Sequence, residues 1–201
     1  MDLMQIFTLI TGVIYILLEI RQKNFMWVVG IATSLAAMWV FFRQGLYASF
    51  GLNTYYFITA FVGLWQWYRA KKQLSCNDSP AENVVVLNPL AWKTVFWSAI
   101  VCVAGIPALS GGMSLLHEAG LAGENPMSLL DSSVAVLSAV ATWWLVKAYR
   151  EQWLLWIVAD MLSVVLCAMQ GMWWMSALYL AYVAAAAYGL YYWKKHGKYV
   201  I

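Results

Sequence analysis

The fold is decided by residues 152–171, which read QWLLWIVADMLSVVLCAMQG, because a similar pattern occurs 126 positions earlier. The earlier copy is MWVVGIATSLAAMWVFFRQG at residues 26–45, so Trp153 aligns with Trp27 and both copies end in Gln-Gly. Each copy carries an apolar run close to the ~20 residues that cross the hydrocarbon core of a bilayer as a helix. The stretch therefore predicts a membrane helix inside an internal repeat.

The composition around this stretch is that of a membrane protein. Of the 201 residues, 64% are hydrophobic and 10% are charged, whereas a soluble domain carries about 25% charged residues. Polar segments at residues 71–89 and 110–131 are predicted loops, with a short interfacial helix as an alternative within the second. The chain is predicted to be an all-α polytopic membrane protein with seven transmembrane helices, at residues 5–20, 25–42, 46–67, 92–109, 132–146, 152–168 and 172–193.

The basic residues predict the orientation of these helices. With seven spans, eleven of the twelve Lys and Arg residues fall on one side and only Arg43 falls on the other. Because loops rich in Lys and Arg stay in the cytoplasm, the C-terminus is predicted to be cytoplasmic and the N-terminus external. The eleven are Arg21, Lys23, Arg69, Lys71, Lys72, Lys93, Lys147, Arg150, Lys194, Lys195 and Lys198.

The repeat extends over three helices without a gap. At the same spacing Tyr56 aligns with Tyr182, Gly63-Leu64 with Gly189-Leu190, and Trp67 with Trp193. Three helices reverse the direction of the chain, so a fourth must precede a second copy of the same polarity. The predicted plan is 3+1+3 with two parallel three-helix repeats: a first repeat at 1–72, a linker with the fourth helix and its loops at 73–131, and a second repeat with the tail at 132–201.

Parallel repeats place a substrate site near the middle of the membrane, so polar residues at that depth are the candidates. Asp160 is the only ionisable residue expected at mid-span, and a charged group there is costly unless it faces a cavity or a partner. Its repeat mate is Ser34. Asn53 is the other strongly polar residue at depth, and its mate Tyr179 stands one turn from Tyr182. Packing between helices is the alternative interpretation for Asp160 and Asn53.

Aromatic residues surround these positions. Tyr56 shares a helix face with Asn53, and Trp153 and Trp156 lie on one face of the sixth helix, with Trp156 one turn before Asp160. Such a face beside an acid suits a flat, cationic, heteroaromatic ligand. Anchoring at the membrane interface is the alternative for Trp153. Gln66, between two expected interface anchors, is a further candidate for substrate binding.

Several kinds of chemistry are not expected. Cys76, Cys102 and Cys167 are widely spaced and form neither a disulfide framework nor a metal motif. His117 and His196 lie far apart in the sequence, so no metal or nucleophile constellation is predicted. The sequence carries no Gly-rich phosphate loop, and we predict no cofactor and no nucleic-acid partner.

The chain resembles the Pnu vitamin transporters. The resemblance rests on WVVG at residues 27–30, GLYAS at 45–49, GLWQW at 63–67, EQWLLW at 151–156 and Gln170-Gly171. It covers both repeats, at residues 19–72 and 147–195, and leaves out the fourth helix. Many members have Gln in the third helix and Asn in the sixth, where this chain has Asn53 and Asp160.

The resemblance implies a SWEET-like homotrimer in a bacterial inner membrane. It also implies facilitated diffusion of a vitamin that a cytoplasmic kinase then traps by phosphorylation. Nicotinamide riboside is the substrate we expect first. Thiamine is the alternative within the family, which also contains riboflavin carriers. An intramembrane enzyme or a structural membrane subunit is the alternative from a different class.

Overall fold

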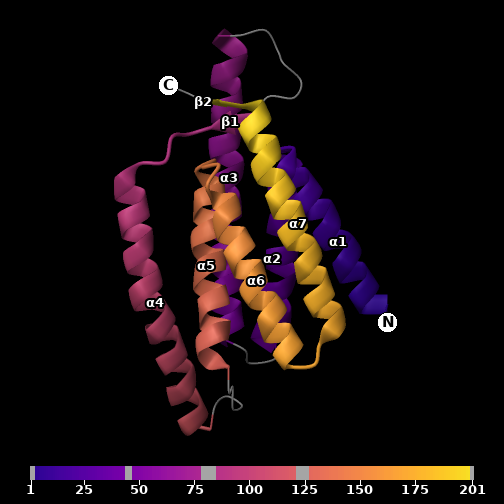
Figure 1. Cartoon of the computed structure of the whole chain (residues 1–201), viewed down its shortest axis with the longest axis vertical. Helices are drawn as coiled ribbons and strands as arrows, with labels where there is room; N and C mark the ends of the chain where they lie inside the picture. Colours follow the sequence, from indigo (N-terminus) through magenta and orange to yellow (C-terminus); the bar gives the residue numbers. More distant parts are fainter. Residues whose placement is uncertain (1–2, 44–46, 78–84, 121–126, 200–201) are drawn as a thin grey trace. The chain divides into compact units, whose positions relative to one another are not determined.

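The computed structural model describes residues 3–43, 47–77, 85–120 and 127–199, and this part of the chain forms seven helices and two short strands. Figure 1 traces them in chain order. The helices and strands are α1 (Leu3–Ile20), α2 (Phe25–Arg43), α3 (Tyr47–Asn77), β1 (Val85–Leu87), α4 (Trp92–Glu118), α5 (Ser128–Val146), α6 (Gln152–Met169), α7 (Trp173–His196) and β2 (Gly197–Tyr199).

Two helices extend well beyond the spans that hydropathy predicts, and a third begins earlier. α3 continues to Asn77, α4 continues to Glu118 and α5 begins at Ser128. The first predicted loop was therefore wrong at its first residues and the second at both ends, because these residues are helical. Lys, Gln and Leu favour helix in water as well as in lipid, which explains the extension of α3. Gly111 and Gly112 each cost the helix only about 1 kcal/mol and do not end it. The left-handed turn comes at Gly120, where φ is +71°.

The chain divides into two compact units. The first contains Met1–Asn88, Thr142–Arg150 and Gly189–Ile201, and the second contains Pro89–Ala141 and Glu151–Tyr188. The first unit thus holds α1, α2, α3 and both strands, together with the C-terminal ends of α5 and α7. The second holds α4 and α6 with the remaining parts of α5 and α7.

Within the first unit, α2 packs along α3. The contact is close because Gly63 has no side chain: a Cβ at this position would overlap the ring of Trp27. The rings of Trp27 and Trp67 meet edge to face with centroids 5.0 Å apart. Both indoles are buried, so the two helices share an aromatic core at this end.

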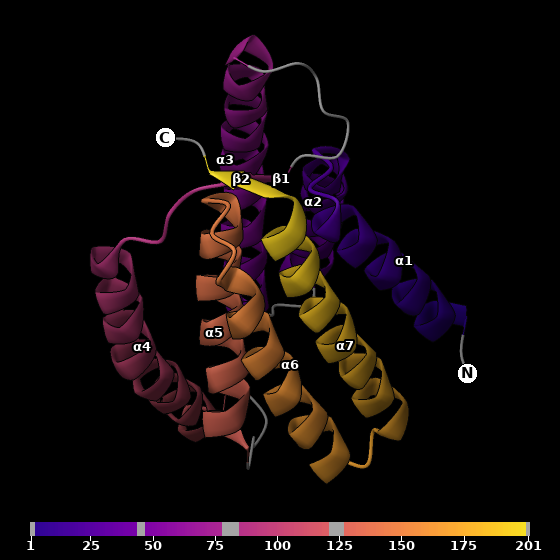
Figure 2. The same ribbon diagram turned by 45° about the horizontal axis from the view of Figure 1, so that its top comes forward.

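A two-stranded parallel sheet lies beside α3 where α7 ends (Figure 2). β1 comes from the segment predicted as a loop, and β2 directly follows α7. Val85, Val86 and Leu87 pair with Gly197, Lys198 and Tyr199. All three β1 side chains are buried. A run of three apolar residues is too short to be predicted as a strand from hydropathy. The pairing is tight at Gly197, where a Cβ would overlap Leu87 and the Trp193 carbonyl.

α1 and α5 end in the same way. Gln22 and Ala148, which lie 126 positions apart, both adopt left-handed backbone conformations, with φ of 48° and 54°. In both turns the following amide returns to the helix, since Lys23 N donates to Leu18 O and Tyr149 N donates to Trp144 O. This is the arrangement of a helix C-cap that normally favours glycine.

The second unit holds the most clearly membrane-like segments. α4, α5 and α6 are long and apolar enough to cross a membrane by length and composition, and Phe25–Ala36 in the first unit is a shorter apolar stretch. Ser110 of α4 bonds to Ser128 at the start of α5 at 2.9 Å. Ser176 of α7 donates to the Val164 carbonyl of α6 at 3.1 Å.

Candidate functional site

The second unit brings Asp160 together with two tyrosines. Asp160 lies in the middle of α6 and is 8% exposed. Tyr179 and Tyr182 of α7 are both close enough to interact with it electrostatically. Their rings meet edge to face with centroids 6.0 Å apart. A carboxyl group therefore lies beside an aromatic pair on two neighbouring helices.

The tryptophans of α6 precede this group along the helix. Trp153 is 1% exposed, which places it in the core and not at an exposed interface. Trp156 is partly exposed as a residue, but its Nε1 atom is buried and has no hydrogen-bond partner within the described part of the chain. A buried donor without a partner is costly, so such an atom is suited to a ligand that can accept its hydrogen bond.

The first unit holds the aligned positions Ser34, Asn53 and Tyr56. Ser34 is buried on α2, while Asn53 and Tyr56 are half-buried on α3. The rings of Tyr55 and Tyr56 lie 5.7 Å apart. These residues provide neutral hydrogen-bonding groups and aromatic surface. Ser34 carries no charge where Asp160 has a carboxyl group.

Two residues in α1 were missed by the sequence analysis. Tyr15 interacts electrostatically with Tyr56 and Glu19, and its hydroxyl lies beside Gly30 of α2. Glu19 is only 4% exposed, which makes it a second buried acid besides Asp160. Its position in an otherwise apolar helix could have identified it. Glu19 stands next to the predicted end of that helix.

Gln66 is engaged by the end of α5. In the amide orientation that satisfies both of its polar atoms, Nε2 donates to Val146 O at 3.1 Å and Oε1 accepts from Lys147 Nζ at 3.2 Å. The neighbouring Trp67 donates to Leu145 O at 3.2 Å. These contacts give Gln66 a structural role in the first unit, at the end of α5.

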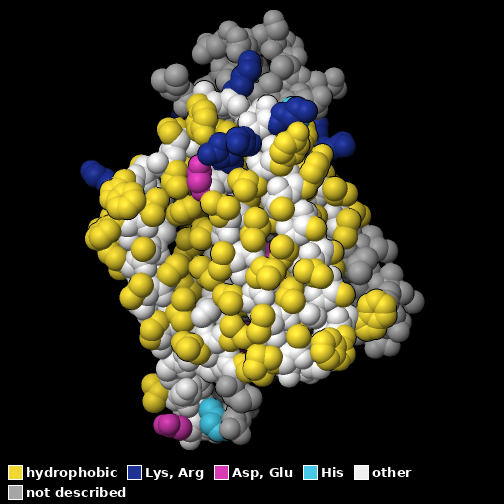
Figure 3. Space-filling model, viewed as in Figure 1, with side chains coloured by type: hydrophobic (Ala, Val, Ile, Leu, Met, Phe, Trp, Pro, Cys, Tyr) yellow, Lys and Arg dark blue, Asp and Glu magenta, His cyan; other side chains and the backbone are white. Residues whose placement is uncertain are grey.

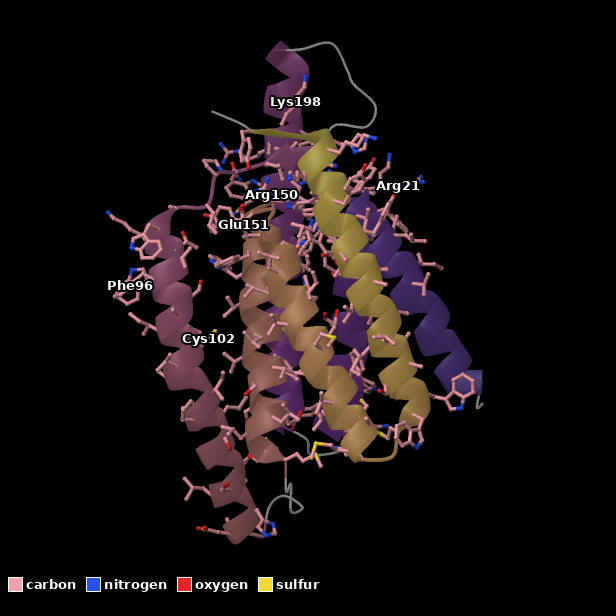
Figure 4. The ribbon with its side chains drawn as sticks, viewed as in Figure 1. Arg21, Phe96, Cys102, Arg150, Glu151 and Lys198 are labelled. Atoms are coloured by element: carbon pink, nitrogen blue, oxygen red, sulfur yellow. The ribbon has the colours of Figure 1, made fainter. Side chains whose placement is uncertain are left out.

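Basic side chains gather at the end of the first unit that carries β1 and β2 (Figure 3). Figure 4 labels Arg21, Arg150 and Lys198 there. Lys71 donates to the Gln22 carbonyl and, at 3.1 Å, to Asn24 Oδ1. Burial and then the charge of Lys23 lower the pKa of Lys71 from its ordinary 10.5 to about 8. We call this the basic end; in the first unit it comprises Arg21, Lys23, Arg69, Lys71, Lys72, Lys147, Arg150, Lys194, Lys195 and Lys198.

A metal centre does not emerge from the described residues, where no three His, Cys, Asp or Glu side chains are grouped to hold an ion. The residues around Asp160 offer groups for recognition: hydrogen bonds from tyrosine hydroxyls and indole N–H groups, stacking on aromatic rings, and attraction of a cation by a carboxylate.

Comparison with known proteins places this arrangement among transporters. Residues 2–195 match the sequence profile of the family described as "Nicotinamide mononucleotide transporter". The nicotinamide riboside transporter PnuC of Escherichia coli (strain K12) is 31% identical over 172 residues, which cover 77% of this chain and 69% of that protein. PnuC of Neisseria mucosa is 26% identical over 195 residues, which cover 92% of this chain and 70% of that protein.

The fold is also similar to a solved structure. The chain aligns with the crystal structure of the vitamin B3 transporter PnuC with a TM-score of 0.63 and 25% sequence identity. The alignment covers 94% of this chain and 79% of that one. The profile match over residues 2–195 includes α4, which the motifs quoted from the sequence leave out.

Proposed function

Because the chain belongs to the nicotinamide mononucleotide transporter family, we propose that it carries nicotinamide riboside across a membrane into the cell. The observation that carries this proposal is the family match over residues 2–195, supported by curated relatives that are nicotinamide riboside transporters. The family is one of transporters, so an intramembrane enzyme and a structural subunit are set aside.

The group of Asp160, Tyr179 and Tyr182 supports a cationic heteroaromatic substrate. A nicotinamide ring that carries a ribose on its nitrogen is flat and positively charged. A carboxylate attracts such a ring, the faces of aromatic residues stack on it, and indole N–H groups and tyrosine hydroxyls can bond to its polar substituents. We propose Trp153, Trp156, Asp160, Tyr179 and Tyr182 as substrate-binding residues of the second unit.

The first unit contributes its own candidates. Ser34, Asn53 and Tyr56 occupy the aligned positions at depth, and Tyr15 lies close to Tyr56. Hydroxyl and amide groups suit the ribose hydroxyls and the carboxamide of the vitamin. Gln66 stays a weaker candidate, since its amide is engaged with Val146 and Lys147.

We propose that all seven helices cross the membrane in a 3+1+3 arrangement of two parallel repeats. The matching left-handed caps at Gln22 and Ala148 support a repeat of 126 residues. The basic end supports a cytoplasmic C-terminus and an external N-terminus. The resemblance to the Pnu transporters is the source of the proposed location in the inner membrane of a bacterium. The proposed domain limits are 1–72, 73–131 and 132–201.

Transport is proposed to be facilitated diffusion in a homotrimer, with a cytoplasmic kinase trapping the vitamin by phosphorylation. The resemblance to the Pnu transporters is the source of the trimer and of the kinase. Downhill transport agrees with the sequence, which contains no motif for ATP hydrolysis. Thiamine is the second candidate substrate because its thiazolium ring is also flat and cationic.

Calorimetry with the purified protein tests the substrate. We expect nicotinamide riboside to bind more tightly than thiamine and riboflavin. Nicotinamide mononucleotide serves as a matched ligand that differs by one phosphate. Tighter binding of thiamine would replace the proposed substrate, and absence of heat from all four ligands would contradict a vitamin site.

A further inference from the structure

The basic end of the first unit contains a seam between two parts of the chain. On one side are the ends of α1 and α3, from the first predicted repeat. On the other are β1, β2 and the ends of α5 and α7. Trp67 of α3 donates to the Leu145 carbonyl of α5, and Trp193 of α7 donates to the Ile20 carbonyl of α1 at 2.9 Å. The two aligned indoles thus cross the seam in opposite directions, and their rings also meet, with centroids 6.3 Å apart.

Gln22 makes a further connection across the seam, in addition to the bonds of Gln66 to Val146 and Lys147. Its Nε2 donates to Val86 O at 2.9 Å, and its Oε1 accepts from Val86 N at 2.7 Å. The carboxamide therefore pairs with the backbone of β1 as a neighbouring strand would. Gln22 is 1% exposed and has a left-handed backbone, a conformation that is unusual for a residue other than glycine.

β1 makes more bonds to β2 and to the end of α5 than it makes to α1. It pairs with β2 through three residues in register. The adjacent Asn88 donates from its backbone N to Ala148 O at 3.2 Å and from Nδ2 to Lys147 O at 2.8 Å. A single side chain thus links β1 to α1, whereas a sheet and two further hydrogen bonds link it to α5 and α7.

We propose that the Gln22 carboxamide is a latch, and that its pairing with Val86 breaks whenever the basic end opens during transport. The inference rests on the proposed transport function. A carrier that releases substrate at this end must separate the two sides of the seam. β1 has fewer bonds to α1, through Gln22 alone, than to β2 and the end of α5. We therefore expect the Gln22–Val86 bonds to break, so that β1 moves away from α1 together with α5, α7 and β2.

Cross-linking tests the latch directly. In a full-length protein with Cys76→Ser, Cys102→Ala and Cys167→Ala, Gln22→Cys is combined with Val86→Cys and linked by a short, cleavable bismaleimide. The matched control links Leu87→Cys to Tyr199→Cys, which pair inside the sheet. We expect the first link to stop nicotinamide riboside uptake by proteoliposomes while binding persists, and cleavage to restore uptake. The control link should leave uptake unchanged.

Each other outcome overturns the latch. If uptake continues with Gln22 linked to Val86, the pairing of these residues stays closed during transport and is not a latch. If both links stop uptake, the movement takes place elsewhere than between Gln22 and Val86. The cysteine-free parent, which keeps Gln22 and Val86, reports on the proposed function, since absence of nicotinamide riboside uptake there refutes the substrate and not the latch.

A second variant avoids dependence on the cysteine pair. Gln22→Glu keeps the size of the side chain and replaces the Nε2 donor by an oxygen that faces Val86 O. Loss of one hydrogen bond should change the uptake rate by about threefold or more. Asn24→Asp is the control on the same turn. A rate equal to that of the parent in Gln22→Glu would overturn the latch as well.

Discussion

Residues 26–67 and 152–193 share their structural aromatic residues but differ in the polar residues at depth. Trp27 and Trp153 are each 1% exposed, and Trp67 and Trp193 are 2% and 0% exposed. The aligned polar positions differ, since Ser34 corresponds to Asp160 and Asn53 corresponds to Tyr179. The buried indoles therefore hold the fold in both regions, while the carboxylate that can recognise a cation lies in the second.

The largest expected effect is on binding in the second region. Trp156→Ala and Tyr182→Ala should each weaken nicotinamide riboside binding by about 1–3 kcal/mol, the scale of one base stacked on an aromatic side chain. Calorimetry measures the change, and Trp174→Ala, at a residue 71% exposed, is the control. If both variants bind like the parent, the aromatic site is wrong.

The shared scaffold is tested by a pair of glycines in α3. Gly63→Ala places a methyl group against the Trp27 ring and should lower the free energy of unfolding by about 1–3 kcal/mol, as overpacking does. Gly51→Ala is the matched variant, because nothing lies within 4 Å of a Cβ there. It should be neutral or slightly stabilising. Equal melting temperatures for the two variants would contradict the close packing of α2 on α3.

The charge difference between the regions is tested at Asp160. Asp160→Asn keeps size and hydrogen bonding but removes the charge, so affinity for the cationic vitamin should fall several-fold, up to about tenfold or 1.4 kcal/mol. The melting temperature should stay close to the parent's. If Asp160 serves only in packing, the Asn variant binds normally, whereas Asp160→Leu lowers stability by leaving a partner unpaired.

The smallest expected effect is a pH dependence from the basic end. The pKa of Lys71 is about 8 in the folded chain and 10.5 ordinarily, so between these values the unfolded chain holds more protons. The free energy of unfolding should therefore rise as the pH increases from 8 to 10.5. Lys71 should add no pH dependence below pH 8, where it is protonated in both states. Lys71→Met should flatten this slope in thermal unfolding, compared with exposed Lys72→Met. An identical slope in both variants would show that Lys71 is not the group responsible.

Hydropathy located the seven helices of the described residues because each contains an apolar run of helical length. It could not locate the ends of α3 and α4, since Lys71 and Gly112 are compatible with helix outside lipid. Nor could it predict β1, whose three residues are buried by pairing with β2 from the far end of the sequence. Such pairing leaves no periodic signal.

The candidate site was only partly accessible to sequence reasoning. An acid in an apolar helix identified Asp160. Its closeness to Tyr179 and Tyr182 depends on how α6 packs against α7, which the repeat alignment did not predict. The same rule should have identified Glu19. The engagement of Gln66 by α5 depends on a contact between distant segments, which a single sequence does not reveal.

Counterflow in liposomes measures facilitated diffusion of nicotinamide riboside itself. Vesicles that contain the purified protein and are loaded with unlabelled nicotinamide riboside should accumulate labelled vitamin from outside in the absence of any ion gradient. Empty liposomes are the control. We expect exchange to proceed with sodium and protons equal on both sides. Exchange that required a proton or sodium gradient, or that did not occur with nicotinamide riboside, would contradict facilitated diffusion of this vitamin.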